Sequence, residues 1–168
     1  MKEINYGRVP QPKPDCTNIP IILSDETMQY RYQKVLKRMQ EENFDILVIY
    51  ADLEHGSNFE YLCGFLPRFE EALLVMHQDG CNYMLMGNEN LNKVEHARIN
   101  AEAIHVPHFS LPNQPMDNKA SFGELLKAAK IESGKKVGIV GWKNFTSKYD
   151  DNHNLFDVPY YIVQEINM

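Results

Sequence analysis

Three runs of consecutive apolar residues constrain the fold of this chain more than any other feature. They occupy residues 46–50, 72–76 and 137–141, and polar residues do not interrupt any of them. Successive side chains of a strand point to opposite faces of a sheet, so a strand that is apolar throughout must be covered on both faces. The three runs therefore predict a sheet buried between two layers of helices.

The segments between these runs carry helix and turn signals. Ser24 can cap a helix whose apolar side chains recur at helical spacing as far as Met39, and Asn43 can close that helix in the left-handed conformation. Ser121 and Glu124 form a capping box before a later helix. Further predicted elements are a turn at 79–80, a strand at 81–86, a helix opening at 87–89, and strands at 103–106 and 160–163. The alternation predicts a three-layer α/β domain with a mixed sheet.

Composition narrows the class of protein. The chain has 168 residues, 43% of them hydrophobic, and its net charge of −6 gives no support to a nucleic-acid partner. The three cysteines are widely spaced and form no CxxC pair, which favours neither zinc nor a disulfide framework. No apolar run approaches the roughly 20 residues that span a bilayer. We therefore expect a cytoplasmic protein without a membrane partner.

The first residues differ from the rest of the chain. Four prolines, at positions 10, 12, 14 and 20, lie within residues 1–23, which show no apolar periodicity. Proline disfavours helix interiors and central strands, so this segment is predicted to be an extended Pro-rich arm. The sequence thus predicts two parts, the arm at 1–23 and one domain at 24–168.

A polar cluster follows the first apolar run directly. Asp52, Glu54 and His55 come just after the predicted strand at 46–50, and open α/β sheets often bind ligands at such strand ends. A carboxylate beside an imidazole can raise its basicity or take part in a metal site. The alternative is a hydrogen-bonded loop that caps the next helix.

The loop at 64–69 presents a second candidate surface. It combines Phe65, Arg68 and Phe69 on one short connection. Exposed aromatic residues with arginine are typical anchors of interfaces, and arginine can clamp a carboxylate with two hydrogen bonds. The alternative is that the phenylalanines fold into the core. We expect Phe65 to point inward and Arg68 outward.

The order of these pieces resembles the N-terminal domain of the creatinase/prolidase/Xaa-Pro aminopeptidase family. The resemblance spans roughly residues 25–165 and is carried by the first helix and strand, Asn58 with YLCGF at 61–65, and the hairpin at 72–86. It implies a ribonuclease-H-like α/β layer that precedes a C-terminal catalytic domain. In that second domain two Asp, one His and two Glu hold a dinuclear site of Mn, Co or Zn.

The resemblance also implies roles for loops of this domain. Family members form homodimers or higher oligomers, and loops of the N-terminal domain close over a neighbouring subunit's active site. On that basis Arg68 and Phe69 are expected contacts to a partner's substrate or active-site rim. The stretch with Asp52, Glu54 and His55 matches a loop near the same interface.

No position of this sequence matches the family's metal ligands. The resemblance therefore predicts a non-catalytic accessory domain without a cofactor of its own, whose partner is a C-terminal catalytic domain of an Xaa-Pro peptidase-type hydrolase. The alternative is a stand-alone small-molecule-binding or interaction protein, with Asp52, Glu54, His55 and Arg68 lining its pocket. A small α/β enzyme, such as a phosphatase or a receiver-like module, is a third hypothesis.

Overall fold

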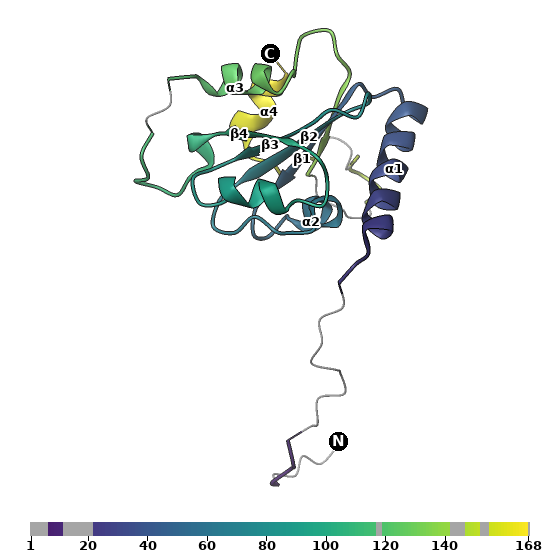
Figure 1. The fold of residues 1–168 in the computed structure, drawn as a ribbon, viewed down its shortest axis with the longest axis vertical. Coiled ribbons are helices and arrows are strands. Elements are labelled where there is room, and N and C mark those ends of the chain that lie inside the picture. The colour runs from purple at the N-terminus through teal and green to yellow at the C-terminus, as the bar shows by residue number, and fades with distance from the viewer. Residues whose placement is uncertain (1–6, 12–21, 117–118, 142–146, 152–154, 168) are drawn as a thin grey trace.

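A five-stranded sheet forms the centre of the molecule (Figure 1). The computed structural model describes residues 7–11, 22–116, 119–141, 147–151 and 155–167. In spatial order β4-β3-β2-β1-β5, the strands are β4 (Glu102–His105), β3 (Asn82–Met86), β2 (Ala72–His77), β1 (Ile46–Ala51) and β5 (Val137–Val140). The three apolar runs are therefore strands of one sheet, as the sequence predicts. The prediction that all three are buried is wrong for β5, which is an edge strand and only half-buried.

The sheet is mixed. The strands β1, β2 and β3 form an antiparallel meander, while β4 runs parallel to β3 and β5 runs parallel to β1. At the tight turn between β2 and β3, Gly80 takes φ +92° and the Asp79 side chain accepts a hydrogen bond from the Cys81 amide at 2.9 Å. A left-handed glycine and an Asp side chain bonded two residues ahead explain why Asp-Gly predicts this turn.

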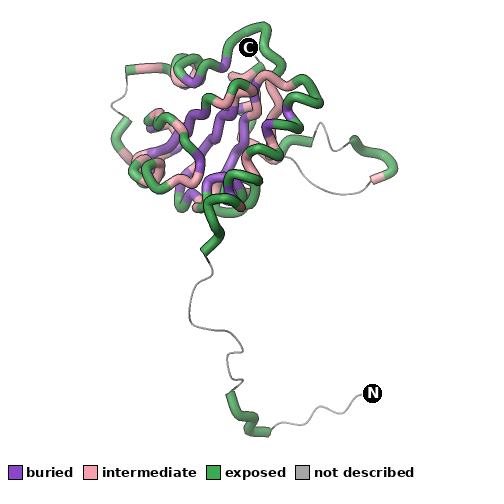
Figure 2. The backbone as a smooth tube through the Cα atoms, turned by 45° about the vertical axis from the view of Figure 1, so that its right-hand side comes forward, coloured by how far each residue is buried: buried purple, intermediate pink, exposed green. Residues whose placement is uncertain are grey.

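Helices cover both faces of the sheet. On one face lie α1 (Asp25–Glu41), α2 (Ser57–Cys63) and the 3₁₀ helix η1 (Leu91–His96), and on the other lie α3 (Phe122–Ala128) and α4 (Tyr160–Ile166). A second 3₁₀ turn, η2 (Pro107–Phe109), follows β4. Each face has its own apolar cluster, and Figure 2 shows the central strands β1, β2 and β3 as the most buried part of the backbone. The predicted α/β fold is confirmed.

The predicted helix ends are also present. The Ser24 side chain accepts a hydrogen bond from the Thr27 amide at the start of α1, and Asn43 takes φ 56° just past its end. Ser121 and Glu124 form the reciprocal capping box of α3. These local signals are visible in the sequence because each depends on residues only a few positions apart.

Two predicted elements are different in the structure. The segment predicted as a strand at 160–163 is the helix α4, which follows Pro159 and places buried Ile162 and half-buried Ile166 one turn apart against the core. Short aromatic and β-branched runs are ambiguous between strand and helix, and packing decides. The segment predicted as a helix from 87–89 forms the 3₁₀ helix η1 instead. Trp142, the only tryptophan of the sequence, lies outside the described residues.

Candidate functional site

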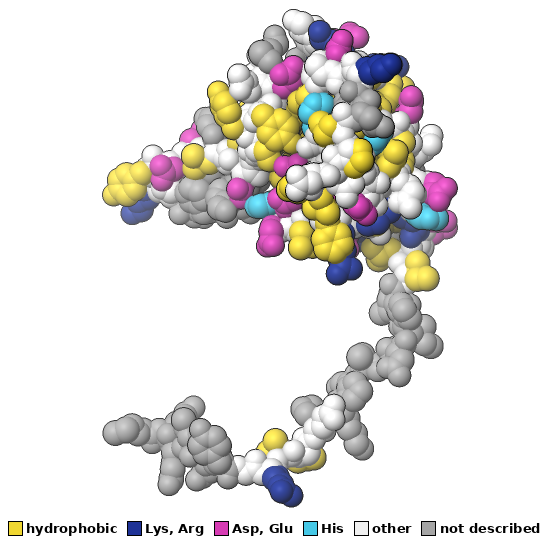
Figure 3. Space-filling view, turned by 90° about the vertical axis from the view of Figure 1, so that its left-hand side faces the viewer, with side chains coloured by type: hydrophobic (Ala, Val, Ile, Leu, Met, Phe, Trp, Pro, Cys, Tyr) yellow, Lys and Arg dark blue, Asp and Glu magenta, His cyan; other side chains and the backbone are white. Residues whose placement is uncertain are grey.

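A cleft of about 530 Å³ opens at the end of the sheet where β1 finishes and β2 begins. The loop from β1 to α2, the loop before β2 and the segment after η2 surround it. Figure 3 looks onto this end of the molecule, where hydrophobic and acidic side chains lie side by side and most Lys and Arg lie toward the margins. The lining residues are Tyr50, Asp52, Leu53, Glu54, Phe69, Glu70, Glu71, Phe109, Ser110, Leu111 and Pro112. We call it the strand-end cleft.

The strand-end cleft brings together three of the five predicted site residues. Asp52, Glu54 and Phe69 line it. His55 does not line it but is bonded to Asp52, and Arg68 lies beside it with its guanidinium 5.1 Å from the centre of the Phe69 ring. The two stretches meet because β1 and β2 pair so that Ala51 lies opposite Ala72.

Asp52 is the centre of a dense hydrogen-bond network. Its Oδ1 accepts from the backbone amides of Glu54 at 2.8 Å and His55 at 2.7 Å. The hydroxyl of Tyr50 donates to Oδ2 at 3.0 Å, and His55 Nδ1 lies 2.8 Å from Oδ1. These contacts agree with the alternative of a hydrogen-bonded loop. The loop does not cap the next helix through a side chain, because the N-cap residue of α2 is Gly56.

Both ring nitrogens of His55 face carboxylates. His55 Nδ1 faces Asp52, and His55 Nε2 lies 3.1 Å from Oδ2 of Asp157, a residue just before α4. The hydrogen bond with Asp52 raises the pKa of His55 above its usual value, and burial only partly offsets this. Burial by itself would raise the pKa of Asp52, but hydrogen bonds from His55, Tyr50 and Glu54 lower it overall. The arrangement therefore favours an imidazolium between two carboxylates.

The contacts of His55 leave neither ring nitrogen free to bind a metal ion. A histidine ligates a metal through a neutral ring nitrogen, and here both nitrogens already face carboxylate oxygens. In the described ranges no group of three or more His, Cys, Asp or Glu side chains is placed to hold a metal ion. The Asp52–His55–Asp157 set is thus suited to joining two segments of the chain, the β1–α2 loop and the start of α4.

The raised pKa of His55 predicts a pH-dependent stability. The contribution of a group whose pKa is higher in the folded state is complete below its unfolded pKa of about 6.5 and is lost as the pH rises through the folded value. The side chain is 36% exposed, so the solvent-screened range of up to about 1 kcal/mol applies. We expect the free energy of unfolding to fall by up to about that amount as the pH rises from below about 6.5 through the raised pKa of His55, measured by urea denaturation.

His55→Gln is the control for this prediction. Glutamine keeps a hydrogen-bonding side chain but does not titrate, so the variant should lack this part of the pH dependence. Identical pH profiles for the two proteins would contradict the imidazolium assignment.

A half-buried acid, Glu71, lines the strand-end cleft and interacts with two phenols, Tyr50 in the lining and Tyr161 outside it. Glu71 is half-buried, and burial raises its pKa, as does the nearby charge of Asp52. The Tyr161 hydroxyl donates to Glu71 Oε2 at 3.3 Å. Burial is also the largest cause of the raised pKa values of Tyr50 and Tyr161. Both phenols are therefore neutral donors beside carboxylates at ordinary pH.

The loop carrying Arg68 and Phe69 rests on a buried polar support. Asn90 is fully buried, donates from Nδ2 to the Arg68 carbonyl at 2.9 Å and accepts from the Arg68 amide at 3.3 Å. Glu70, only 4% exposed, accepts from the backbone amides of Glu89 and Asn90 and from the Asn90 side chain. The backbone on both sides of Phe69 is therefore held in place.

Phe69 is presented to solvent in an uncommon conformation. Its φ is +71°, which is unfavourable for a residue with a large side chain, and it is 61% exposed. Phe65 instead packs edge-on against the buried ring of Phe59 at 5.5 Å between ring centres. The prediction that Phe65 points inward and Arg68 outward is confirmed. An exposed, strained aromatic on a rigid support is typical of a functional contact.

The comparisons with known proteins identify the family. The profile of the Creatinase/Prolidase N-terminal domain matches residues 31–149, which is most of the chain. The chain belongs to this family. A comparison with curated proteins found no match.

Solved structures with a similar fold include three proteins. Against this creatinase/prolidase N-terminal domain, dipeptidase PepE from Mycobacterium ulcerans is 12% identical with a TM-score of 0.45, and the match covers 64% of this chain and 27% of that protein. The N-terminal domain of a putative metallopeptidase from Corynebacterium diphtheriae is 16% identical with a TM-score of 0.40, and the match covers 68% of this chain and 94% of that domain. An Xaa-Pro aminopeptidase from Streptococcus thermophilus is 14% identical with a TM-score of 0.41, and the match covers 84% of this chain and 98% of that chain. The chain spans about a quarter of the PepE length.

Several residues of the site were not predicted from the sequence. Glu71 directly precedes the apolar run at 72–76, and it reaches the end of the sheet at which Asp52 lies because β2 runs antiparallel to β1. Asn90, Asp157 and Tyr161 carry no local signal, because each reaches the site from a distant part of the chain. In this creatinase/prolidase N-terminal domain the supporting residues are therefore visible only after folding.

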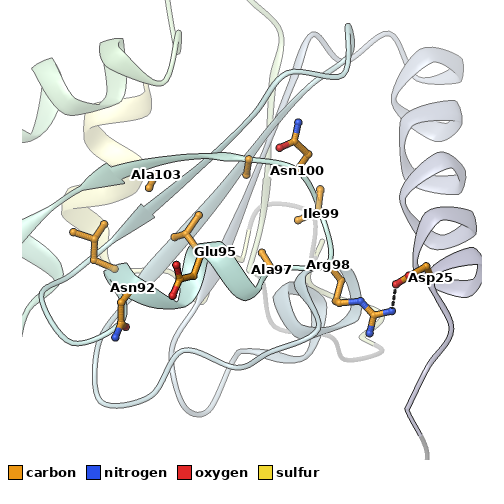
Figure 4. Close-up of a pocket in the computed structure, with 11 residues that line it drawn as sticks. Asp25, Asn92, Glu95, Ala97, Arg98, Ile99, Asn100 and Ala103 are labelled. Carbon is orange, nitrogen blue, oxygen red and sulfur yellow. Dashed lines mark hydrogen bonds and ion pairs between the residues drawn. The ribbon is translucent and has the colours of Figure 1, made fainter.

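A larger groove of about 790 Å³ lies elsewhere, between η1 and β4 (Figure 4). Six of its eleven lining residues are apolar, and the Arg98 guanidinium at one end donates to Asp25 and to the carbonyl of Leu23. No predicted site residue lines it. Arg98 is already engaged, so the groove offers little free chemistry, and we take the strand-end cleft as the candidate site.

Among the helices that the structure describes, none combines the length and the apolar character needed to cross a bilayer.

Proposed function

We propose that this creatinase/prolidase N-terminal domain is a non-catalytic accessory domain of an Xaa-Pro peptidase-type metal-dependent hydrolase. In this proposal it forms a homodimer or higher oligomer, and Arg68 and Phe69 contact the substrate or active-site rim of a neighbouring subunit. The observation that carries the proposal is the exposed Phe69 beside Arg68, held by the buried Asn90 and Glu70. Aromatic and arginine side chains that are fixed in advance lose little entropy on binding.

The chemistry of the cleft supports an accessory role. His55 has no ring nitrogen available as a metal ligand or general base. We therefore place the divalent metal pair (Mn, Co or Zn) in a following C-terminal catalytic domain, the main partner of this one. The two cysteines among the described residues, Cys63 and Cys81, are both free thiols, which fits a reducing compartment such as the cytoplasm.

Arg68→Ala in the complete gene product tests the proposal. We expect kcat/KM for an Xaa-Pro peptide to fall about tenfold, equivalent to about 1.4 kcal/mol of lost transition-state contact, while the metal content stays unchanged. Steady-state kinetics and metal analysis measure the two quantities. Arg38→Ala is the matched control, because Arg38 is an exposed arginine at the end of α1 that pairs with Glu41 and Glu42. Equal kinetics for the two variants would contradict the role of Arg68.

The intact mass of the native gene product separates this proposal from its alternative. A mass well above 19.5 kDa would support an accessory domain attached to a catalytic domain. A native mass of 19.5 kDa would favour a stand-alone binding or interaction protein that uses the strand-end cleft.

A further inference from the structure

We infer that the strand-end cleft binds a segment of a partner polypeptide in which a Lys or Arg lies beside an apolar residue. The inference rests on the proposed function, in which this cleft is a contact surface, and adds the chemistry of the occupant. Its basis is the combination of an acidic floor with an exposed apolar rim.

The acidic floor lacks positive charge of its own. Among the lining residues are Asp52, Glu54, Glu70 and Glu71, and no Lys or Arg is among them. His55 compensates Asp52, and backbone amides and Asn90 satisfy Glu70. Glu54 and Glu71 have no ion pair with any described residue, so a cation entering the cleft would find two carboxylates to pair with.

The rim is apolar and open to solvent. Phe69 is 61% exposed, Leu53 is 53% exposed and Leu111 is 37% exposed, and all three line the same cleft. Apolar side chains of a partner would remove this surface from water, which favours association. The aliphatic stem of a Lys or Arg can also lie against the Phe69 ring while its charged end reaches the floor.

Charge decides among possible occupants. A phosphate group, a nucleic acid or an anionic membrane would meet carboxylates. The imidazolium of His55 is already bonded to Asp52, and the Arg68 guanidinium already lies over the Phe69 ring. The net charge of −6 would further favour the approach of a basic partner. A polypeptide segment satisfies both requirements, because a chain can place a basic and an apolar side chain close together on one short stretch.

Fluorescence anisotropy with a labelled peptide tests the inference on the 168-residue chain. The probe is Ser-Gly-Leu-Arg-Phe-Lys-Gly-Ser. One comparison peptide replaces Arg and Lys by Glu, and a second replaces Leu and Phe by Ser. We expect a Kd of roughly 10–100 μM for the probe and binding at least about tenfold weaker for either comparison peptide. Added salt should weaken the binding of the probe.

Variants connect the binding to this cleft. Glu71→Gln removes the unpaired charge but keeps the acceptor for Tyr161, and Phe69→Gly removes the ring while suiting the left-handed backbone, so both should fold. Each should weaken binding about fivefold or more. Glu132→Gln is the control, since Glu132 is an exposed acid that does not line this cleft, and it should leave binding unchanged.

Any of three results would overturn the inference. The first is equal binding of the basic and acidic peptides, and the second is unchanged binding of the probe by both cleft variants. The third is displacement of the labelled probe by free arginine amide at the same concentration as by unlabelled probe peptide. The last result would identify a small organic cation as the occupant. Peptide binding without any kinetic effect of Arg68→Ala would contradict the proposed function only. A kinetic effect without peptide binding would contradict only this inference.

Discussion

Replacing Asn90 by alanine should lower the free energy of unfolding by about 2–4 kcal/mol. Asn90 is fully buried and bonds the Arg68 backbone through both its side-chain oxygen and its nitrogen, while also donating to Glu70. Removing it leaves the Arg68 carbonyl and a buried carboxylate short of partners, and buried groups without partners are costly. Urea denaturation followed by circular dichroism measures the loss.

Asn92→Ala is the matched control for this experiment. Asn92 lies two positions further on, in η1, and its side chain is exposed, so its replacement should change stability by less than about 0.5 kcal/mol. If both variants lose the same stability, the buried network does not support the Arg68–Phe69 loop.

Replacing Phe59 by alanine should lower the free energy of unfolding by about 3–5 kcal/mol. Phe59 is fully buried in α2, where its ring packs edge-on against Phe65. The substitution creates a cavity beneath the helix that connects the Asp52–His55 loop to the Arg68–Phe69 loop, so we also expect the peptide affinity of the cleft to fall. Chemical denaturation gives the first quantity and fluorescence anisotropy the second.

Phe69→Ala provides the comparison with the same change of side chain. Phe69 is mostly exposed, so losing its ring should alter stability by no more than about 0.5 kcal/mol, and its effect should appear in binding instead. A loss of stability as large as that of Phe59→Ala would show that the Phe69 ring belongs to the core and would contradict its assignment to the contact surface.

Part of the candidate site could be predicted from the sequence. Asp52 and Phe69 meet at one cleft because a short helix joins two antiparallel strands, and the pairing of Ala51 with Ala72 brings the flanking loops together. Such proximity follows from local order along the chain. The chemistry of His55 could not be predicted from the sequence, because its second partner, Asp157, comes from a distant part of the chain.

Local sequence signals are enough to predict the strands of the sheet, the first helix and the capping box of α3, because periodicity, capping residues and turn residues act over a few positions. Tertiary structure alone decided that residues 160–163 form a helix rather than a strand, that Asn90 holds the Arg68 backbone, and that Tyr161 reaches Glu71. These contacts join residues distant in the chain, and only the packing of both helix layers on one sheet brings them together.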